Sequence, residues 1–400
     1  MKIDTDPKKI EEFLTRGVEN LYPSPDFVKK LLLSGKKLRI YLGVDPTGPT
    51  LHLGHAIQLK KLGELQKLGH EIILLIGDFT AMIGDPTDKA TTRKQLTRRQ
   101  VLNNCKLYKK QASTFLYFSL FDGAKLKYNS KWLDKMNFGD VLNLASKMSV
   151  QQMLERDMFK KRMEEGRPIF IHEFLYPLMQ GYDSVAMDVD GEIGGNDQTF
   201  NMLTGRNLMK EILNKEKFVI TSKLLTDSTG VKMGKTDNNG VNLNDDANEM
   251  FGKIMSWTDG MIFSGFELCT YVSIDEIEKI RQDMMNGENP RNIKVRLAKE
   301  IVAIYHSKEA ADKAEENFVK TFKEGGLPEK IEELKGVIGK LISETAVIAK
   351  VVASKSEYRR LVEEGAVSDA ISGEKITDPN ETIKNPTVYK IGKRRFFKVS

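Results

Sequence analysis

The chain has 400 residues, 40% of them apolar and 30% charged, which is the balance of a soluble globular protein with two or three domains of about 150 residues each. No apolar run approaches the roughly 20 residues of a membrane-crossing helix, and the N-terminal residues lack the apolar core of a signal peptide. This composition excludes a disordered or fibrous protein. Two cysteines are too few for a disulfide framework or a cysteine-based zinc site, so a cytoplasmic location without export or a membrane partner is expected.

The net charge of +6 is concentrated in two stretches of the chain. Residues 87–110 carry eight basic side chains and one acidic one, and residues 390–400 carry five basic side chains and no acidic one. These two excesses are larger than the charge of the whole chain, so the remainder is net acidic. The stretches predict either contacts with phosphate-bearing partners or two solvated surfaces, and charge alone leaves both interpretations open.

The first elements in chain order are a strand, a helix and a second strand. Residues 37–45 have the pattern of a strand, residues 56–68 have the apolar spacing of a helix, and residues 71–78 are almost continuously apolar. Continuous apolarity indicates a strand that is buried on both faces. The unit therefore predicts a doubly wound, Rossmann-like α/β domain, in which helices cover a parallel sheet.

The next part of the chain completes this domain. A polar, helix-favouring insertion over about 126–166 suits a dimer surface. A further strand is expected over 184–188, and a helix over 200–213. Between them lies the glycine pair at 194–195, which lets the backbone approach a ligand closely.

The remainder of the chain predicts a helical region and a small α+β unit, joined by a linker. The expected division is the α/β domain at 1–225, a loop with two lysines at 226–246, an α-helical domain at 247–325, a linker at 326–337 and a small module at 338–400.

Two histidines, His52 and His55, precede the helix expected over 56–68, and Gly54 lies between them. A helix N-terminus presents unpaired N–H groups and the positive end of the helix dipole, which suits phosphate. The same pair could form half of a metal site or could cap the helix. Phosphate is favoured over metal because no cysteine or third ligand is nearby.

Two lysines lie in Lys232-Met-Gly-Lys235-Thr236, within a stretch rich in glycine and small polar residues. Lysines on a mobile loop can close onto a polyphosphate and neutralise charge that develops during transfer. The pentapeptide alone is a weak signal. In this order after the histidine pair, however, it resembles the second of the two signatures, HIGH and KMSKS, of class I aminoacyl-tRNA synthetases.

Three polar residues, Tyr176, Gln180 and Asp183, are spaced so that they share one face of a helix. A polar stripe is usually exposed to solvent. Here its neighbours are Phe, Leu and Met, so the stripe is expected to line a pocket in which each polar group needs a partner.

Together these motifs resemble those of bacterial tyrosyl-tRNA synthetases. In the order of that family, they are Tyr41-x-Gly-x-Asp-Pro-Thr47, His52-x-x-His55, Ile83-Gly-Asp-Pro86, Tyr176-x-x-x-Gln180-x-x-Asp183, Gly194-Gly-x-Asp-Gln198 and the lysine loop. The tail, residues 338–400, resembles the small RNA-binding module that these enzymes share with a ribosomal small-subunit protein. The resemblance also implies that residues 1–225 form the catalytic domain and residues 247–325 an anticodon-binding domain.

The resemblance implies that Tyr41 and Asp183 hold the hydroxyl group of L-tyrosine. A buried pair that hydrogen-bonds a phenol is left unpaired by phenylalanine, and this enzyme family is the known example of such discrimination, about 10⁵-fold. The ammonium group of the substrate would contact Asp85, Tyr176 and Gln180, and Gln198 would lie near its carboxylate.

The resemblance also assigns residues to the other substrates. The expected catalytic residues are Thr47, His52, His55, Lys89, Arg93, Lys232, Lys235 and Thr236, and the expected ATP-binding residues are Asp45, Gly54, Gly194, Asp197 and Lys235. Contacts with tRNA(Tyr) are expected from Lys355, Arg359, Arg360, Lys393, Arg394 and Arg395. A homodimer is expected, with magnesium bound to ATP and no metal held by the protein.

Three alternatives remain at this point: a tryptophanyl-tRNA synthetase, an adenylyltransferase for a small cofactor, and a catalytically silent RNA-binding paralogue. The chain also departs from the family pattern, because Gly234 and Thr236 stand at the two serine positions of the lysine signature. Trp132 and Trp257 are expected to be packing residues, and His70 is expected to be structural.

Overall fold

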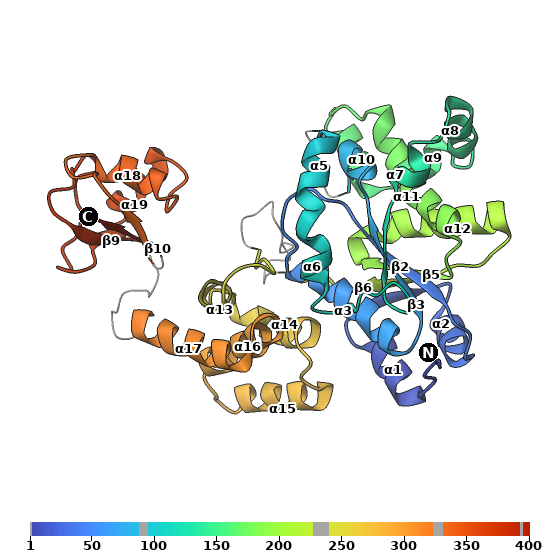
Figure 1. Cartoon of the computed structure of the whole chain (residues 1–400), viewed down its shortest axis with the longest axis horizontal. Helices are drawn as coiled ribbons and strands as arrows, with labels where there is room; N and C mark the ends of the chain where they lie inside the picture. The colour runs from blue at the N-terminus through green and yellow to red at the C-terminus, as the bar shows by residue number, and fades with distance from the viewer. Residues whose placement is uncertain (1, 88–94, 227–239, 323–330, 393–394) are drawn as a thin grey trace. The chain divides into compact units, whose positions relative to one another are not determined.

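The computed structural model describes residues 2–87, 95–226, 240–322, 331–392 and 395–400. It divides into two compact units, Met1–Ala311 and Asp312–Ser400 (Figure 1). Within the described ranges, no helix is both long and apolar enough to cross a membrane. Seven of the expected site residues lie outside these ranges: Lys89, Arg93, Lys232, Lys235, Thr236, Lys393 and Arg394.

A six-stranded sheet forms the centre of the first unit, with the strand order β1-β6-β5-β2-β3-β4. Its strands are β1 (Val18–Tyr22), β2 (Arg39–Val44), β3 (Glu71–Ile76), β4 (Lys125–Tyr128), β5 (Gly191–Gly195) and β6 (Phe218–Ser222). Neighbouring strands run parallel except β1, which is antiparallel to β6. The strand order reverses between β2 and β5, and a crevice for ligands is expected outside the carboxyl ends of these two strands. The prediction of a doubly wound, Rossmann-like sheet is confirmed.

Helices cover both faces of this sheet. Helix α3 (Leu53–Lys67) contacts β2, β3 and β5, while α11 (Ile171–Met187) and α12 (Thr199–Leu213) pack against each other, with α12 against β5 and β6. Gln58 of α3 contacts Ser222 of β6, whereas Ser184 of α11 contacts Lys217, which lies five residues before Ser222. Because side chains alternate along a strand, these contacts place α3 and α11 on opposite faces.

The other helices of the first unit are shorter. They are α1 (Pro7–Thr15), α2 (Pro25–Leu33), α4 (Thr80–Ile83), α5 (Arg98–Asn104), α6 (Tyr108–Ala112), α7 (Ser130–Leu133), α8 (Phe138–Ala145), α9 (Val150–Leu154) and α10 (Asp157–Glu164). The expected insertion begins later than predicted, because Lys125–Tyr128 forms β4, an edge strand paired with β3.

The strand expected over 184–188 is wrong. These residues continue α11, which ends where Asp188 adopts a left-handed backbone conformation with φ of 48°. The strand of this region is β5, formed by the glycine-rich residues 191–195. A short apolar run fits a strand and a buried helix equally well, so periodicity could not separate the two.

A helical region follows the sheet, as predicted. It comprises α13 (Ala247–Met255), α14 (Ile262–Cys269), α15 (Ile274–Met285), α16 (Pro290–Tyr305) and α17 (Lys308–Phe322), the last of which crosses the division between the units. Arg16 and Lys60 both donate to the carbonyl oxygen of Thr270, just after α14. Basic groups suit this position because the last carbonyl groups of a helix lack partners within the helix.

The second unit combines two helices, α18 (Ile342–Ile348) and α19 (Lys355–Glu363), with a four-stranded sheet. The strand order is β7 (Glu332–Leu334), β10 (Arg395–Val399), β9 (Thr387–Ile391) and β8 (Val367–Asp369). Strand β7 lies inside the linker expected over 326–337, so that expectation is wrong for these residues. Parallel pairing with β10 recruits this charged segment into the sheet.

His70 is buried at the start of β3, and its Nδ1 accepts a hydrogen bond from the backbone N–H of Leu38. Burial lowers the pKa of His70 to about 4. The unfolded chain, in which this pKa is about 6.5, therefore binds a proton more readily than the folded protein. The neutral ring contributes about 3 kcal/mol to the free energy of unfolding above pH 6.5, and this contribution is lost as pH falls from there toward 4.

We expect His70→Asn, which keeps an acceptor near the Leu38 N–H but does not titrate, to flatten the pH dependence of stability between pH 6.5 and 4. Urea denaturation of both proteins across this range measures the difference between their unfolding free energies. The contributions of the carboxylates cancel in this difference because both proteins contain them. Parallel pH profiles would show that His70 does not couple protonation to folding.

Candidate active site

The candidate site is a gap between strand β2 and helix α11. Tyr41, Gly43 and Asp45 alternate onto one face of the sheet, and α11 lies over them because Ser184 pairs with the Tyr41 hydroxyl at 2.9 Å and the Tyr176 hydroxyl donates to Asp45 at 2.9 Å. The strand rises about 13 Å from Tyr41 to Asp45, and the helix rises about 12 Å from Tyr176 to Ser184. The two contacts therefore require α11 to run antiparallel to β2. Gly43, in the middle, has no side chain and is exposed although it lies within a central strand.

One end of the gap is buried. Tyr41 is fully buried and Asp183 nearly so, and burial raises the pKa of both groups well above the usual range. Asp183 accepts hydrogen bonds from Trp132 Nε1 at 2.7 Å and from Asn129 Nδ2 at 3.2 Å. Trp132 therefore orients a site carboxylate in addition to packing, which the sequence analysis missed. This end suits a hydroxyl group, which can both donate and accept.

The other end carries acceptors for a cation. Asp45 accepts from Thr80 at 2.7 Å as well as from Tyr176, and Asp85 accepts from Gln198 Nε2 at 2.7 Å. These contacts join Tyr176 to Asp45 and Gln198 to Asp85, and Tyr176, Asp85 and Gln198 are three of the residues expected around the amino and carboxylate groups of the substrate.

The wall between the two ends is apolar. Ile73 and Leu75 of β3 lie in register with Tyr41 and Gly43, and both are buried in one cluster with Tyr41 and Met187. The gap therefore suits a molecule with an apolar ring, a hydroxyl group at one end and a cationic group at the other.

The two histidines begin α3, after the loop that follows β2. His52 is the N-cap residue, its Nδ1 accepts from the Gly54 N–H at 3.1 Å, and His55 Nδ1 accepts from the His52 N–H at 3.3 Å. The capping interpretation is therefore correct. It is compatible with phosphate binding, because a neutral ring that accepts at Nδ1 carries its hydrogen on Nε2, where it can donate.

The described residues on either side of 227–239 lie next to the histidine motif. Downstream, the Leu53 N–H donates to the carbonyl of Val241, and the Leu243 N–H donates to the carbonyl of Leu51. Upstream, Ser222 accepts a hydrogen bond from Gln58 of α3. The described residues on both sides of 227–239 therefore contact the helix that carries His52 and His55 or the residues just before it.

The loop after β2 is held by neighbouring helices. Tyr108 donates to the carbonyl of Gly48 at 2.7 Å, and Gln111 accepts from the Leu51 N–H at 2.7 Å. Thr47 is exposed on this loop. Near the end of β5, buried Gly194 leaves room for the Met202 sulfur, which a Cβ would approach to 2.7 Å. Asp197 follows in a short 3₁₀ helix (Asn196–Gln198).

The expected RNA-binding residues belong to the second unit, and three of them are paired with acids. Lys355 contacts Glu344 at 2.7 Å, Arg395 contacts Glu357 at 2.7 Å, and Arg360 lies 3.7 Å from Glu364. Arg359 is exposed and makes no ion pair with the described residues.

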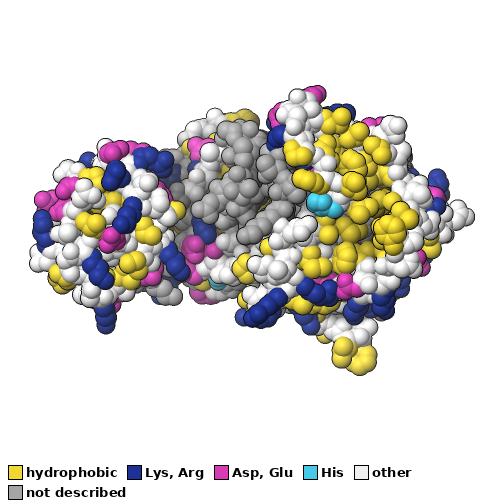
Figure 2. All heavy atoms as spheres, turned by 90° about the horizontal axis from the view of Figure 1, so that it is seen from above, with side chains coloured by type: hydrophobic (Ala, Val, Ile, Leu, Met, Phe, Trp, Pro, Cys, Tyr) yellow, Lys and Arg dark blue, Asp and Glu magenta, His cyan; other side chains and the backbone are white. Residues whose placement is uncertain are grey.

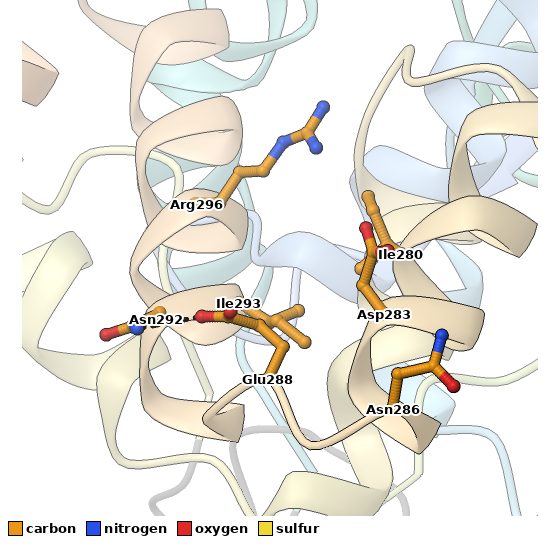
Figure 3. A pocket seen from close by; sticks show the side chains of 7 residues that line it. All are labelled: Ile280, Asp283, Asn286, Glu288, Asn292, Ile293 and Arg296. Atoms are coloured by element: carbon orange, nitrogen blue, oxygen red, sulfur yellow. Dashed lines mark hydrogen bonds between the residues drawn. The ribbon is translucent and has the colours of Figure 1, made fainter.

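A separate hollow of about 430 Å³ lies between α15 and α16 (Figure 3). Asp283 and Arg296 face each other across it, and Asn292 donates to Glu288 at 2.8 Å at its lower rim. Carboxylate and amide groups dominate this hollow.

The family model, the curated relatives and the solved structures that match this chain all describe aminoacyl-tRNA synthetases. A family model described as tRNA synthetases class I (W and Y) matches residues 33–323. Relatives named tyrosine–tRNA ligase from Carboxydothermus hydrogenoformans and Photobacterium profundum are 48% and 46% identical, with 98% and 97% of the chain and the same shares of the relatives covered.

Two solved structures share the fold. One is a C-terminally truncated mitochondrial tyrosyl-tRNA synthetase from Coccidioides posadasii, with a TM-score of 0.63, 25% identity, and coverage of 78% of this chain and 90% of that one. The other is a tyrosyl-tRNA synthetase from Archaeoglobus fulgidus in complex with L-tyrosine, with a TM-score of 0.60, 22% identity, and coverage of 77% and 99%.

Gly77, directly after β3, tests how tightly the polar end of the gap is built. A Cβ at this position would lie 1.9 Å from Asp45 Oδ1 and 2.4 Å from Thr80 Oγ1, so Gly77→Ala must displace their hydrogen bond. We expect a loss of about 1–3 kcal/mol in unfolding free energy, measured by urea denaturation. Gly252→Ala in α13, where a Cβ meets no atom within 4 Å, is the control and should not lower stability. Equal stability of the two variants would contradict the close packing around Asp45.

Proposed function

This chain belongs to the class I tyrosyl-tRNA synthetases, and we propose that the gap between β2 and α11 is its tyrosine pocket. The enzyme activates L-tyrosine with ATP, forming tyrosyl adenylate and pyrophosphate, and transfers the tyrosine to the 3′-terminal ribose of tRNA(Tyr). The names of the relatives disfavour a tryptophanyl enzyme and a silent paralogue. The observation that carries the pocket assignment is Gly43, exposed within a central strand between a hydroxyl-binding and a cation-binding end.

In this pocket, Tyr41 and Asp183 hold the phenol, and Asp85, Tyr176 and Gln180 surround the ammonium group. Asn129 and Trp132 support this arrangement, because their hydrogen bonds fix both oxygens of Asp183. The apolar wall of Ile73 and Leu75 packs against the ring of the substrate.

ATP is placed at the carboxyl ends of β2 and β5, with its phosphates near Thr47, His52 and His55. Its ribose lies near Asp197 and the close backbone of Gly194. The tyrosine carboxylate attacks the α-phosphate and pyrophosphate leaves, with no covalent enzyme intermediate. Catalysis then depends on positioning and on stabilisation of charge, to which Lys232, Lys235, Thr236, Lys89 and Arg93 contribute.

Magnesium enters this reaction with ATP. Within the described residues, no three or more His, Cys, Asp or Glu side chains gather at a potential metal site. Phosphate oxygens and water are the ligands that Mg²⁺ commonly keeps, so the protein need not supply a cage.

The helical region and the second unit serve tRNA. The hollow between α15 and α16 offers acceptor groups to an unstacked base of an anticodon loop, which proteins read by hydrogen bonds to its exposed edges. In the second unit, Arg359 and the basic residues at its C-terminal end contact the phosphate backbone. We place this activity in the cytoplasm.

The enzyme acts as a homodimer through an apolar patch on α8–α11. Figure 2 shows apolar side chains gathered over one face of the first unit. Exposed large apolar side chains of this segment are Phe138 (77%), Leu142 (56%), Val150 (58%), Met163 (56%), Phe170 (47%) and Ile171 (81%). A patch of this kind on a soluble protein marks an interface.

The tyrosine pocket is tested by Gly43→Ala. A Cβ at Gly43 meets only the Tyr41 ring, at 3.8 Å, so the substitution fits the folded protein. The added methyl group does, however, occupy space in the pocket that the substrate needs. We expect an unchanged urea midpoint and an increase of at least about tenfold in KM for tyrosine, measured by tyrosine-dependent exchange of pyrophosphate into ATP. Gly252→Ala should leave both quantities unchanged. A normal KM in Gly43→Ala would place the amino acid elsewhere.

The homodimer is tested by Ile171→Asp. An acidic residue suits the first turn of α11, so the fold should persist while the charge opposes burial at an interface. Light scattering after gel filtration should show the mass of one chain instead of two. Leu120→Asp, at a side chain that is 97% exposed outside the patch, should leave the mass unchanged. A dimeric Ile171→Asp protein would move the interface away from this patch.

A further inference from the structure

A buried ion pair lies behind the pocket, between Lys217 and Glu192. Both side chains are at most 3% exposed, and the Lys217 ammonium donates to a carboxylate oxygen of Glu192. None of the roles described above uses this pair. Removing two charges from water is costly, so a pair of this kind contributes little to net stability compared with apolar residues of the same shape.

The protein makes room for this ammonium group. Gly205 of α12 lies beside it, and a Cβ there would lie 2.7 Å from Lys217 Nζ and 2.9 Å from Ser184 Oγ. Gly181 of α11 lies against Gly205, so the two helices approach closely at this level. The charged groups facing Lys217 are Glu192, Asp183 and Arg206.

One branch from this pair reaches Gln180. Its Nε2 donates to Glu192 Oε1 at 3.2 Å, while Lys217 holds the other carboxylate oxygen. A carboxylate can only accept, so the amide must present its NH₂ group to Glu192. The Gln180 carbonyl oxygen is thereby turned away from Glu192, in the orientation that accepts a hydrogen bond from an ammonium group.

The other branch reaches Tyr41. Lys217 Nζ donates to Ser184 Oγ at 2.9 Å, and Ser184 pairs with the Tyr41 hydroxyl at 2.9 Å. An ammonium group can only donate, so it occupies a lone pair of Ser184 and leaves the serine hydrogen for the Tyr41 oxygen. The Tyr41 hydroxyl is thus held at a fixed height above the sheet. Glu192 is itself a hydrogen-bond partner of Tyr41 and lies in register with it on the neighbouring strand, whereas Gln180 lies midway between Tyr176 and Ser184 on α11.

We propose that the Lys217–Glu192 ion pair is a positioning element of the tyrosine pocket, which orients the Gln180 amide for the substrate ammonium and fixes the Tyr41 hydroxyl for the substrate phenol. The proposal rests on the pocket assignment made above. It assigns the two groups that hold the amino acid to a single buried ion pair, which reaches Gln180 through Glu192 and reaches Tyr41 both through Ser184 and through Glu192 itself.

Three ligands separate the two branches: L-tyrosine, 3-(4-hydroxyphenyl)propionate, which lacks the ammonium group, and L-phenylalanine, which lacks the hydroxyl. Binding of each to the full chain gives two ratios of Kd relative to tyrosine, one for the ammonium and one for the hydroxyl. Glu192→Gln should lower the ammonium ratio about tenfold, because an amide at this position can donate or accept and no longer orients Gln180. Ser184→Ala should lower the hydroxyl ratio by a similar factor.

The double variant Lys217→Met/Glu192→Gln removes both charges together and should lower both ratios, with unchanged affinity for ATP. Glu216→Gln is the matched control, since Glu216 is next to Lys217 in sequence and is paired with Arg206, and neither member of that pair hydrogen-bonds Gln180 or Ser184 among the described residues. It should leave both ratios unchanged. Urea midpoints identify any variant that fails to fold, and the two single variants then still decide the question.

Gln180→Ala and Tyr41→Phe test the pocket itself. If these two lower their ratios while Glu192→Gln, Ser184→Ala and the double variant all keep wild-type ratios, the positioning role is overturned and the pocket stands. If Gln180→Ala and Tyr41→Phe also keep wild-type ratios, the pocket assignment is wrong and the positioning role falls with it.

Discussion

The site depends on how helix α11 is attached to strand β2. Two hydrogen bonds, Tyr176 to Asp45 and Ser184 to Tyr41, fix the helix at two heights along the strand. Between them, the absence of a side chain at Gly43 turns a helix–sheet interface, which would ordinarily be filled, into a gap. The length of the gap is thus set by the rise of the strand and of the helix between these two contacts, which suits selection of one amino acid by both of its ends.

Several buried polar groups maintain this attachment from behind. Glu173, at the start of α11, is paired with Arg162 at 2.7 Å, and both side chains are almost fully buried. The Lys217–Glu192 pair lies under the middle of the same helix, and Asn129 links Thr80 to Asp183 beneath its pocket-facing side. Breaking one partner of such a contact leaves an unpaired group in an apolar setting, so α11 has few alternative positions.

Local pattern predicted much of this architecture. The strands β2 and β3 were evident from apolar runs, and the helical spacing of Tyr176, Gln180 and Asp183 indicated a shared face. Strand β5 was missed because its glycines read as a loop, and its hydrogen bonds come from neighbouring strands. Contacts such as Lys217 with Glu192 or Trp132 with Asp183 join residues that are 25 and 51 positions apart, and no local rule specifies them. Lys232, Lys235 and Thr236 of the lysine loop lie outside the described ranges, so their assignment remains a prediction.

The contact of Lys60 with the end of α14 has a consequence for proton balance. Burial lowers the pKa of Lys60 to about 8, whereas in the unfolded chain the group titrates near 10.4. Between these values the unfolded chain binds more protons, so unfolding takes up a proton and stability rises with pH across this window. The enthalpy of unfolding measured there includes the heat of proton release from the buffer. The contact between the helical region and α3, the helix that carries His52 and His55, is therefore detectable by calorimetry, because the measured enthalpy of unfolding depends on which buffer is used.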